Sequence, residues 1–571
     1  MNKLDAVDSG SNYRFGDKLQ QASPPRSVFD LSHLSTTTID NAGALIPISL
    51  FEVLPNDDID LSVSSLIRVM PQVVPLYSRQ RLYVHAFYSR MSDLWSGFNT
   101  FMSRGRDGRF LGKMPSISAS MLGFSSSDVV SAGSLADFLG LPQGVKYADL
   151  ATAGVSVLPF VMYQRIWRDY FCNANFYNMD TSLFPSDDSR YRVLDDGVFE
   201  SGAPKLKLKD LLYRCYPDDY FTSALPFPQR GDIPSLSFAL QNFLPIGTED
   251  GVFKSFRYVA THSGTDNIQG LFFDPVSPPS ESDDNRNGFI FQGKNITEAP
   301  VSEFSLGGFP SRLGVNKGVL PISVTLDQLR QLAIAQAELE KMARTDGSYS
   351  DFGLTFFGIR PKNAQDFKPL YVGGSYQSIS FTEVLQTSAS SSDSALGQYA
   401  GHGISADSSR LGSFRADDYG YVMIIASLMP DVYYSQGLDK LWTRSLQSQF
   451  YLPERARLGM QPILNKELFF SGVAGRDNGL FAYQSAFDDY RYKASRISGK
   501  IADKNALSFF PYTQSRKFSS APTFSKEFIE ARDVRKDYLF APNEVAYSAQ
   551  FSIGVRAVRP LPYQAVPAQI I

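Results

Sequence analysis

The segment GYVMIIASL, residues Gly420–Leu428, is almost continuously apolar and overlaps the longest apolar run of the chain, Tyr421–Met429. A membrane-spanning helix needs about 20 apolar residues, so this run is far too short to cross a bilayer. It also lacks the alternation of polar and apolar residues that is typical of a strand with one solvent-exposed face. We therefore interpret Gly420–Leu428 as a β-strand that is covered on both faces.

Three further segments do alternate, as half-buried strands should: Arg81–Tyr88, Ser378–Leu385 and Phe551–Val558. In the third, Phe551 and Ile553 begin a row that should face inward, whereas Arg556 should point away. Short strands, long irregular connections, and 33 Pro with 42 Gly favour a β-sandwich or jelly roll over an α/β fold. We find neither a βαβ rhythm nor an internal repeat.

One longer helix is expected at 325–344. Thr325 can cap it, with Gln328 at the spacing of a capping box, and Gly347 follows its end. We interpret it as a packing helix. Two shorter helices are expected at Phe160–Tyr170 and Asp439–Gln447.

The composition limits the classes of function that the protein can have. The 571 residues include 44 Phe and 29 Tyr, which suit pleated surfaces and contact interfaces, and the net charge is −3. A protein that neutralises nucleic acid by itself would be clearly basic. Cys172 and Cys215 could form one bridge, but we favour two free thiols in a reducing cytoplasm. The N-terminus lacks an apolar signal core, so we expect a protein made in the cytoplasm.

Signatures of catalysis are missing from the sequence: it holds no G-x-S-x-G, H-E-x-x-H, Walker or G-x-G-x-x-G motif. The four histidines are scattered, and His33 and His85 are interpreted as structural. The carboxylates of Asn56–Asp60 could offer oxygen ligands to calcium, but a solvated turn is the favoured interpretation. We predict no enzyme, cofactor or metal site.

One segment suggests nucleic acid. Between Arg491 and Lys536 there are eleven Lys or Arg and four Asp or Glu, interleaved with aromatic residues. Cations pair with phosphates, and aromatic faces stack on unpaired bases. A solvated loop or a subunit contact remains an alternative. The candidate nucleic-acid-facing residues are Arg491, Tyr492, Lys493, Arg496, Lys500, Arg516, Lys517 and Phe518.

Several word-like blocks occur in a fixed order: FDLSH (29–33), YFTSALPFPQRGD (220–232), PDVYYSQGLD (430–439), LGMQPILNKEL (458–468) and YRYKASRISGK (490–500). In this order they resemble the major capsid protein of the Microviridae, and most closely its gokushovirus branch. Roughly half of the chain carries such blocks.

The resemblance implies a mainly β fold: an eight-stranded viral jelly roll with long inserted loops and a few short helices. It implies a structural protein that assembles with itself into a T=1 icosahedral shell around circular single-stranded DNA. A small basic DNA-binding protein is the implied internal partner. A scaffolding protein and a host-surface receptor are further candidates, and no membrane partner is expected. The expected location is the virion, assembled in the host cytoplasm.

The expected organisation has four parts. Residues 1–25 form an N-terminal arm, and 26–246 form the first part of the jelly-roll core with inserted loops. Residues 247–320 form a surface insertion, by position the counterpart of the three-fold protrusion of the resembled coat proteins. Residues 321–571 complete the core with helix 325–344 and a C-terminal strand.

Two other classes of protein are alternatives. A β-sandwich carbohydrate-active enzyme or lectin would suit the aromatic residues and the Asp488–Asp489 pair, but adjacent strand residues point to opposite faces. A phage spike protein is disfavoured because the matching blocks lie in shell-like portions of the chain.

Overall fold

The computed structural model describes residues 24–105, 107–110, 112–117, 124–177, 210–232, 326–345, 349–359, 368–385, 399–502 and 509–564, and six short strands between 246 and 315. The chain divides into two compact units. The first comprises Met1–Gly231 and Leu339–Ile571, and the second comprises Asp232–Glu338. Nearly all of the predicted N-terminal arm, residues 1–25, lies outside the described residues.

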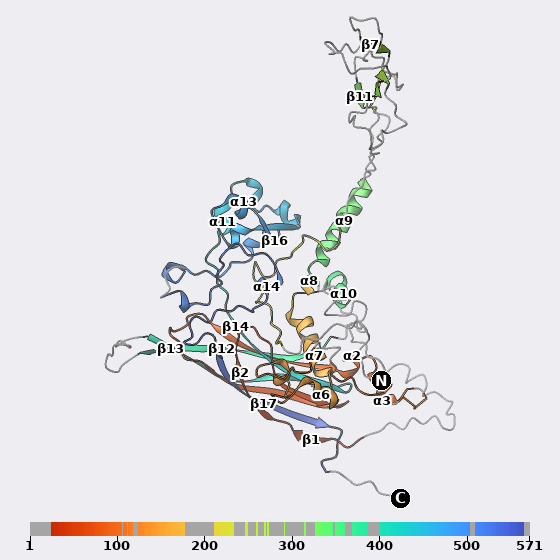
Figure 1. Cartoon of the computed structure of the whole chain (residues 1–571), viewed down its shortest axis with the longest axis vertical. Coiled ribbons are helices and arrows are strands. Elements are labelled where there is room, and N and C mark those ends of the chain that lie inside the picture. The colour runs from red at the N-terminus through yellow and green to blue at the C-terminus, as the bar shows by residue number, and fades with distance from the viewer. Residues whose placement is uncertain are drawn as a thin grey trace. The chain divides into compact units, whose positions relative to one another are not determined.

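The described part of the first unit contains one nine-stranded antiparallel sheet (Figure 1). Its strand order is β1-β17-β4-β13-β12-β5-β14-β3, and β2 also pairs with β17. The strands are β1 (Ser27–Asp30), β2 (His33–Ile39), β3 (Ile46–Val53), β4 (Asp58–Val69), β5 (Gln80–Arg90), β12 (Leu370–Leu385), β13 (Tyr399–Arg415), β14 (Gly420–Pro430) and β17 (Tyr547–Arg559).

The pairing is nested from the ends of the chain inward. Strands β1 and β2 pair with β17, β3 pairs with β14, β4 with β13, and β5 with β12. Further ladders join β17 to β4, β14 to β5, and β12 to β13, which makes two four-strand groups continuous through β12 and β13. A long hairpin rolled up in this way is a jelly roll, so the predicted fold class is confirmed.

Strand β14 separates two hydrophobic cores. Every one of its residues is buried, as the apolar run predicted. Ile424 belongs to the core between the two strand groups, where Phe551 and Ile553 of β17 also lie. Met423 belongs to a second core, on the opposite face of the strand.

Helices and loops cover the outer face of β14 and β5 and so complete the second core. Helix α7 has eight buried residues, and its Tyr163 hydroxyl donates to the carbonyl of Leu45 just before β3, at 2.8 Å. The helical elements here are α2 (Met91–Leu94), α3 (Phe98–Ser103), α5 (Leu135–Phe138), α6 (Tyr147–Thr152), α7 (Leu158–Ile166), a π-helical turn (Trp167–Phe171) and α8 (Ala174–Tyr177).

The part of the first unit after β14, together with Tyr220, Phe221 and Ala224, builds a third, smaller core. It contains the two-stranded ribbon of β15 (Met460–Leu464) and β16 (Leu480–Ser485). Its helices are α11 (Lys440–Thr443), α12 (Asn465–Leu468), α13 (Ala474–Asp477) and α14 (Lys526–Ile529). Single 3₁₀ turns span Gln447–Gln449, Pro453–Arg457, Asp488–Tyr490, Gly499–Ile501 and Phe510–Tyr512.

The helix expected over Asp439–Gln447 is wrong in its extent. Helix α11 ends at Thr443, because Arg444 adopts an extended conformation with φ −72° and ψ 120°. This turns the Arg444 side chain into an ion pair with Asp489, so a tertiary contact overrides the local helical preference. Helix α9 (Leu326–Met342) occupies the expected range 325–344, and α10 (Tyr349–Phe357) follows it. None of the residues of α9 is buried in the described part of the chain, so the structure does not show the packing expected of this helix.

The described part of the second unit consists of short ribbons and most of α9. The ribbons pair β6 (Ile246–Thr248) with β11 (Leu313–Val315), β7 (Val259–Ala260) with β8 (Ile268–Gln269), and β9 (Leu271–Phe272) with β10 (Ile290–Phe291). The predicted insertion 247–320 falls within this unit, and most of it lies outside the described residues.

Candidate functional site

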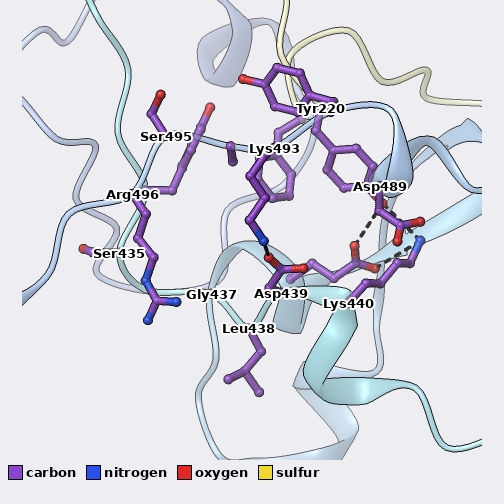
Figure 2. A pocket seen from close by; sticks show the side chains of 15 residues that line it. Tyr220, Ser435, Gly437, Leu438, Asp439, Lys440, Asp489, Lys493, Ser495 and Arg496 are labelled. Atoms are coloured by element: carbon purple, nitrogen blue, oxygen red, sulfur yellow. Dashed lines mark hydrogen bonds and ion pairs between the residues drawn. The ribbon is translucent and has the colours of Figure 1, made fainter.

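Residues from the family-like blocks converge on one pocket of about 110 Å³ in the third core (Figure 2). We call it the Lys440 pocket. Tyr220 comes from YFTSALPFPQRGD, Asp439 from PDVYYSQGLD, Glu467 from LGMQPILNKEL, and Lys493 from YRYKASRISGK. The lining residues are Tyr220, Phe221, Tyr434, Ser435, Gly437, Leu438, Asp439, Lys440, Glu467, Asp489, Tyr492, Lys493, Ala494, Ser495 and Arg496.

Short polar turns fix the walls of this pocket. Asp219 accepts hydrogen bonds from the amides of Phe221 (2.8 Å) and Thr222 (2.7 Å), and from the hydroxyl of Tyr434 (2.6 Å). Glu467 lies in the first turn of α12 and accepts a hydrogen bond from the amide of Leu464 at 3.0 Å. Satisfying these backbone donors holds the side chains in place before any ligand arrives.

A buried charge network forms part of the pocket wall. Lys440 Nζ donates to the Tyr220 hydroxyl at 3.0 Å, and this hydroxyl donates to Glu467 Oε2 at 3.0 Å. Lys440 Nζ also lies 3.8 Å from Glu467 Oε1. Burial lowers the pKa of Lys440 and raises those of Glu467 and Tyr220, because it disfavours each charged form.

The other charged residues of the pocket differ in their pairing. Lys493 forms an ion pair with Asp439, and Arg444 beside the pocket forms one with Asp489. Arg496, exposed at the surface, takes part in no ion pair within the described part of the chain. It is therefore the wall residue most available to an anion.

The remaining residues that were predicted to face nucleic acid lie outside the Lys440 pocket. Arg516, Lys517 and Phe518 line a second pocket of about 340 Å³, which we call the Arg516 pocket. Arg491 pairs with Asp488 at 2.8 Å, and the exposed Lys500 lies in a 3₁₀ turn. The structure thus brings Tyr492, Lys493 and Arg496 together and places the Arg516 group in a separate pocket.

The Arg516 side chain is held by packing. Its guanidinium lies 4.0 Å from the ring centroid of Phe528 and 4.6 Å from that of Tyr216. It also donates to the carbonyl of Phe528 at 2.6 Å. Cation–π contacts of this kind stabilise a desolvated guanidinium, so Arg516 has a structural task besides any contact with DNA.

The sequence did not predict Tyr220, Lys440 and Glu467 as members of a site. Each lies in or directly beside a family-like block, and that position was the available signal. Their convergence was not visible, because Tyr220 and Lys440 are more than 200 positions apart in the chain.

Other residues that the sequence singled out have structural partners. His33 bonds Leu31 O and Ser49 Oγ, each at 2.9 Å, as expected of a structural histidine. Cys172 and Cys215 are free thiols, as predicted. Asp488 and Asp489 of the carbohydrate-enzyme alternative are both paired with arginines, which disfavours acid–base catalysis by them.

The Asn56–Asp60 segment includes the start of β4 at Asp58, and its carboxylates are bound to the residues around it. Asp58 pairs with Arg26 at 2.7 Å, and Asp60 pairs with Arg410 at 2.9 Å. Asp57, fully buried, accepts a hydrogen bond from the amide of Leu54 at 2.9 Å.

Across the described ranges, no three His, Cys, Asp or Glu side chains are grouped so as to hold a metal ion. No helix in those ranges is long and apolar enough to span a bilayer.

Comparison with known proteins identifies the family. Residues 17–569 match the family model described as "Capsid protein (F protein)". The chain is 27% identical over 589 residues to capsid protein VP1 of Chlamydia phage 1, with 95% of each chain covered. It is 28% identical to capsid protein VP1 of Bdellovibrio phage phiMH2K, with 92% covered, and 25% identical to that of Spiroplasma virus 4, with 95% covered. With its jelly roll and a family match over nearly its whole length, the chain belongs to the F-protein family of phage capsid proteins.

Proposed function

We propose that this chain is the shell subunit of a T=1 icosahedral particle that encloses a circular single-stranded DNA genome. The observation that carries the proposal is the nested strand pairing of a complete jelly roll within a chain whose residues 17–569 match a capsid family. Closed shells of identical subunits need extended contacts between copies, and a rigid β-core with long loops supplies them.

The internal surface is proposed to hold DNA through the wall of the Lys440 pocket. Tyr492 provides an aromatic face beside Lys493, while Arg496 is free of ion pairs among the described residues. Arg491 and Lys500 flank this group. Stacking and charge together suit a single strand, whose bases are unpaired and whose phosphates are regularly spaced.

The charge of the chain implies a further partner. A subunit with net charge −3 cannot neutralise a packaged genome, so a small basic DNA-binding protein, polyamines or metal ions must supply positive charge. A scaffolding protein and a host receptor complete the proposed set of partners. Residues 247–320 are proposed to form the three-fold protrusion, and assembly is proposed to take place in the host cytoplasm.

The test is expression of the full chain, alone and with the basic protein encoded by the same genome, followed by cryo-electron microscopy. Closed T=1 shells, with the jelly roll tangential to the surface and DNA against Arg496, are the expected result. A stable monomer in both preparations would overturn the assembly proposal. Shells with DNA density only at other surfaces would overturn the DNA-facing assignment alone.

A further inference from the structure

The segment Leu441–Leu458 exposes more apolar surface than a solvated loop should. Trp442 is 72% exposed, Leu446 61%, Leu458 59% and Phe450 49%. A fully exposed side chain of this size presents roughly 150–250 Å² of surface. Together, these four side chains therefore expose on the order of 500 Å² of apolar surface. Isolated apolar side chains on a surface are ordinary, but a concentration of this size in one short segment marks an interaction site.

This segment is held rigidly although its apolar side chains face solvent. Gln449 Oε1 accepts hydrogen bonds from the amides of Ser445 (2.7 Å) and Leu446 (3.0 Å). Arg455 Nη1 donates to the carbonyls of Gln447 (2.6 Å) and Phe450 (3.0 Å). These bonds tie its two halves together, so the loop cannot fold its apolar side chains inward without breaking them.

The start of the segment is anchored on the Lys440 pocket. Asp439 caps α11 through the amide of Leu441 at 3.3 Å, and Arg444 pairs with Asp489 beneath it. The Arg444 guanidinium also lies 4.3 Å from the ring centroid of Tyr490. A surface that is already ordered loses little conformational entropy on binding, which favours contact with a partner.

We infer that Leu441–Leu458 is a contact between neighbouring copies of this chain, with Trp442 as its anchor; the inference rests on the proposed shell function. A standard interface buries about 800 Å² on each partner, so the four side chains supply more than half of one. Tryptophan and arginine are the residues most enriched at energetically dominant interface positions. Apart from Arg444, which is paired with Asp489 within the subunit, the segment carries two arginines and one glutamate. It is thus net positive in a chain that is net negative, so its charge favours another copy.

The fluorescence of Trp442 can report on this contact. Of its three tryptophans, Trp95 and Trp167 are 2% and 3% exposed, so Trp442 alone is open to solvent. Acrylamide quenching of intrinsic fluorescence therefore reports on Trp442. We expect strong quenching in the dilute subunit, and loss of this quenching with a blue-shifted emission in assembled particles.

The matched variants are Trp442→Ala, Leu446→Ser and, as a control, Ser448→Ala, an exposed polar residue of the same loop. Each of the first two should raise the subunit concentration needed for assembly by about tenfold or more, with an unchanged unfolding midpoint of the subunit. Ser448→Ala should assemble like the original chain.

The outcomes separate this inference from the proposed function. Particles in which Trp442 is quenched as readily as in the subunit, or normal assembly of both apolar variants, would overturn the contact and leave the shell function standing. If no closed particle forms, the shell function fails. In that case shielding of Trp442 in smaller oligomers supports the contact, and its continued accessibility at high concentration refutes it.

Discussion

Met423 and Ile424 are neighbours on β14, both are fully buried, and each lies in a different hydrophobic core. One strand thus links the interior of the jelly roll to the helical cover outside it. Truncation on either face should destabilise the subunit. Met423→Ala and Ile424→Ala are each expected to lower the free energy of unfolding by about 2–5 kcal/mol, measured by urea denaturation of unassembled protein.

The exposed Ser552→Ala on β17 is the matched control and should change this free energy by less than about 0.5 kcal/mol. A small effect of Met423→Ala beside a large effect of Ile424→Ala would mean that the helical cover adds little to the stability of the sheet.

The sequence predicted the parts of the fold that depend on local pattern. Gly420–Leu428 is apolar throughout because both of its faces are covered, and Phe551–Val558 alternates because only one is. Local pattern could not show that Arg444 ends α11, since its partner Asp489 lies far along the chain. Local pattern also could not show that Arg516 is enclosed by Tyr216 and Phe528. A run of basic residues in the sequence does not show which of the charged side chains are packed against others.

The Lys440–Glu467 pair should make stability depend on pH when one partner is removed. Lys440→Met leaves the buried Glu467 carboxylate without its cation, which should cost about 3–5 kcal/mol at pH 8. Burial already raises the pKa of Glu467. The stability linked to a raised carboxyl pKa is present below the unfolded value and is lost as pH rises through the folded value. The penalty should therefore be smaller at pH 5 than at pH 8.

The double variant Lys440→Met with Glu467→Gln removes the uncompensated charge and should recover much of the stability at pH 8. Urea unfolding of the wild type, both single variants and the double variant forms a complete cycle. Equal destabilisation by Lys440→Met at both pH values would contradict the pairing.

His85 should contribute to the loss of stability in acid. It lies on β5 opposite Gly374 of β12 and is hydrogen-bonded to the Tyr371 hydroxyl at 3.2 Å. Burial, followed by the nearby Arg214, lowers its pKa to about 4. A depressed pKa gives stability that is full above the unfolded value near 6.5 and is lost as pH falls toward 4. The largest contribution of this group is about 3 kcal/mol.

His85→Phe keeps an aromatic ring among Tyr83, Phe87 and Tyr371 but removes the titration. Its unfolding free energy should fall less steeply than that of the wild type between pH 6.5 and 4. Tyr371→Phe removes only the hydrogen bond and should retain the wild-type steepness. Parallel curves for His85→Phe and the wild type would rule out this histidine as a source of acid sensitivity.

Arg496 and Arg516 belong to the same basic segment, but truncating them should change different properties: DNA affinity for Arg496 and stability for Arg516. Arg496→Ala removes an exposed cation without an ion pair among the described residues, so the stability of the subunit should not change. The affinity for single-stranded DNA should fall, and the slope of log K against log salt should decrease by about 0.7, because one phosphate fewer is neutralised.

Arg516→Ala instead removes the hydrogen bond to Phe528 O and three ring contacts, and should lower the free energy of unfolding by about 1.5–3 kcal/mol. Fluorescence anisotropy with an oligonucleotide, read beside urea unfolding of the same samples, separates this effect from that of Arg496→Ala. An unchanged salt slope in Arg496→Ala would exclude Arg496 from the DNA contact, because every phosphate that is neutralised must release its counterions.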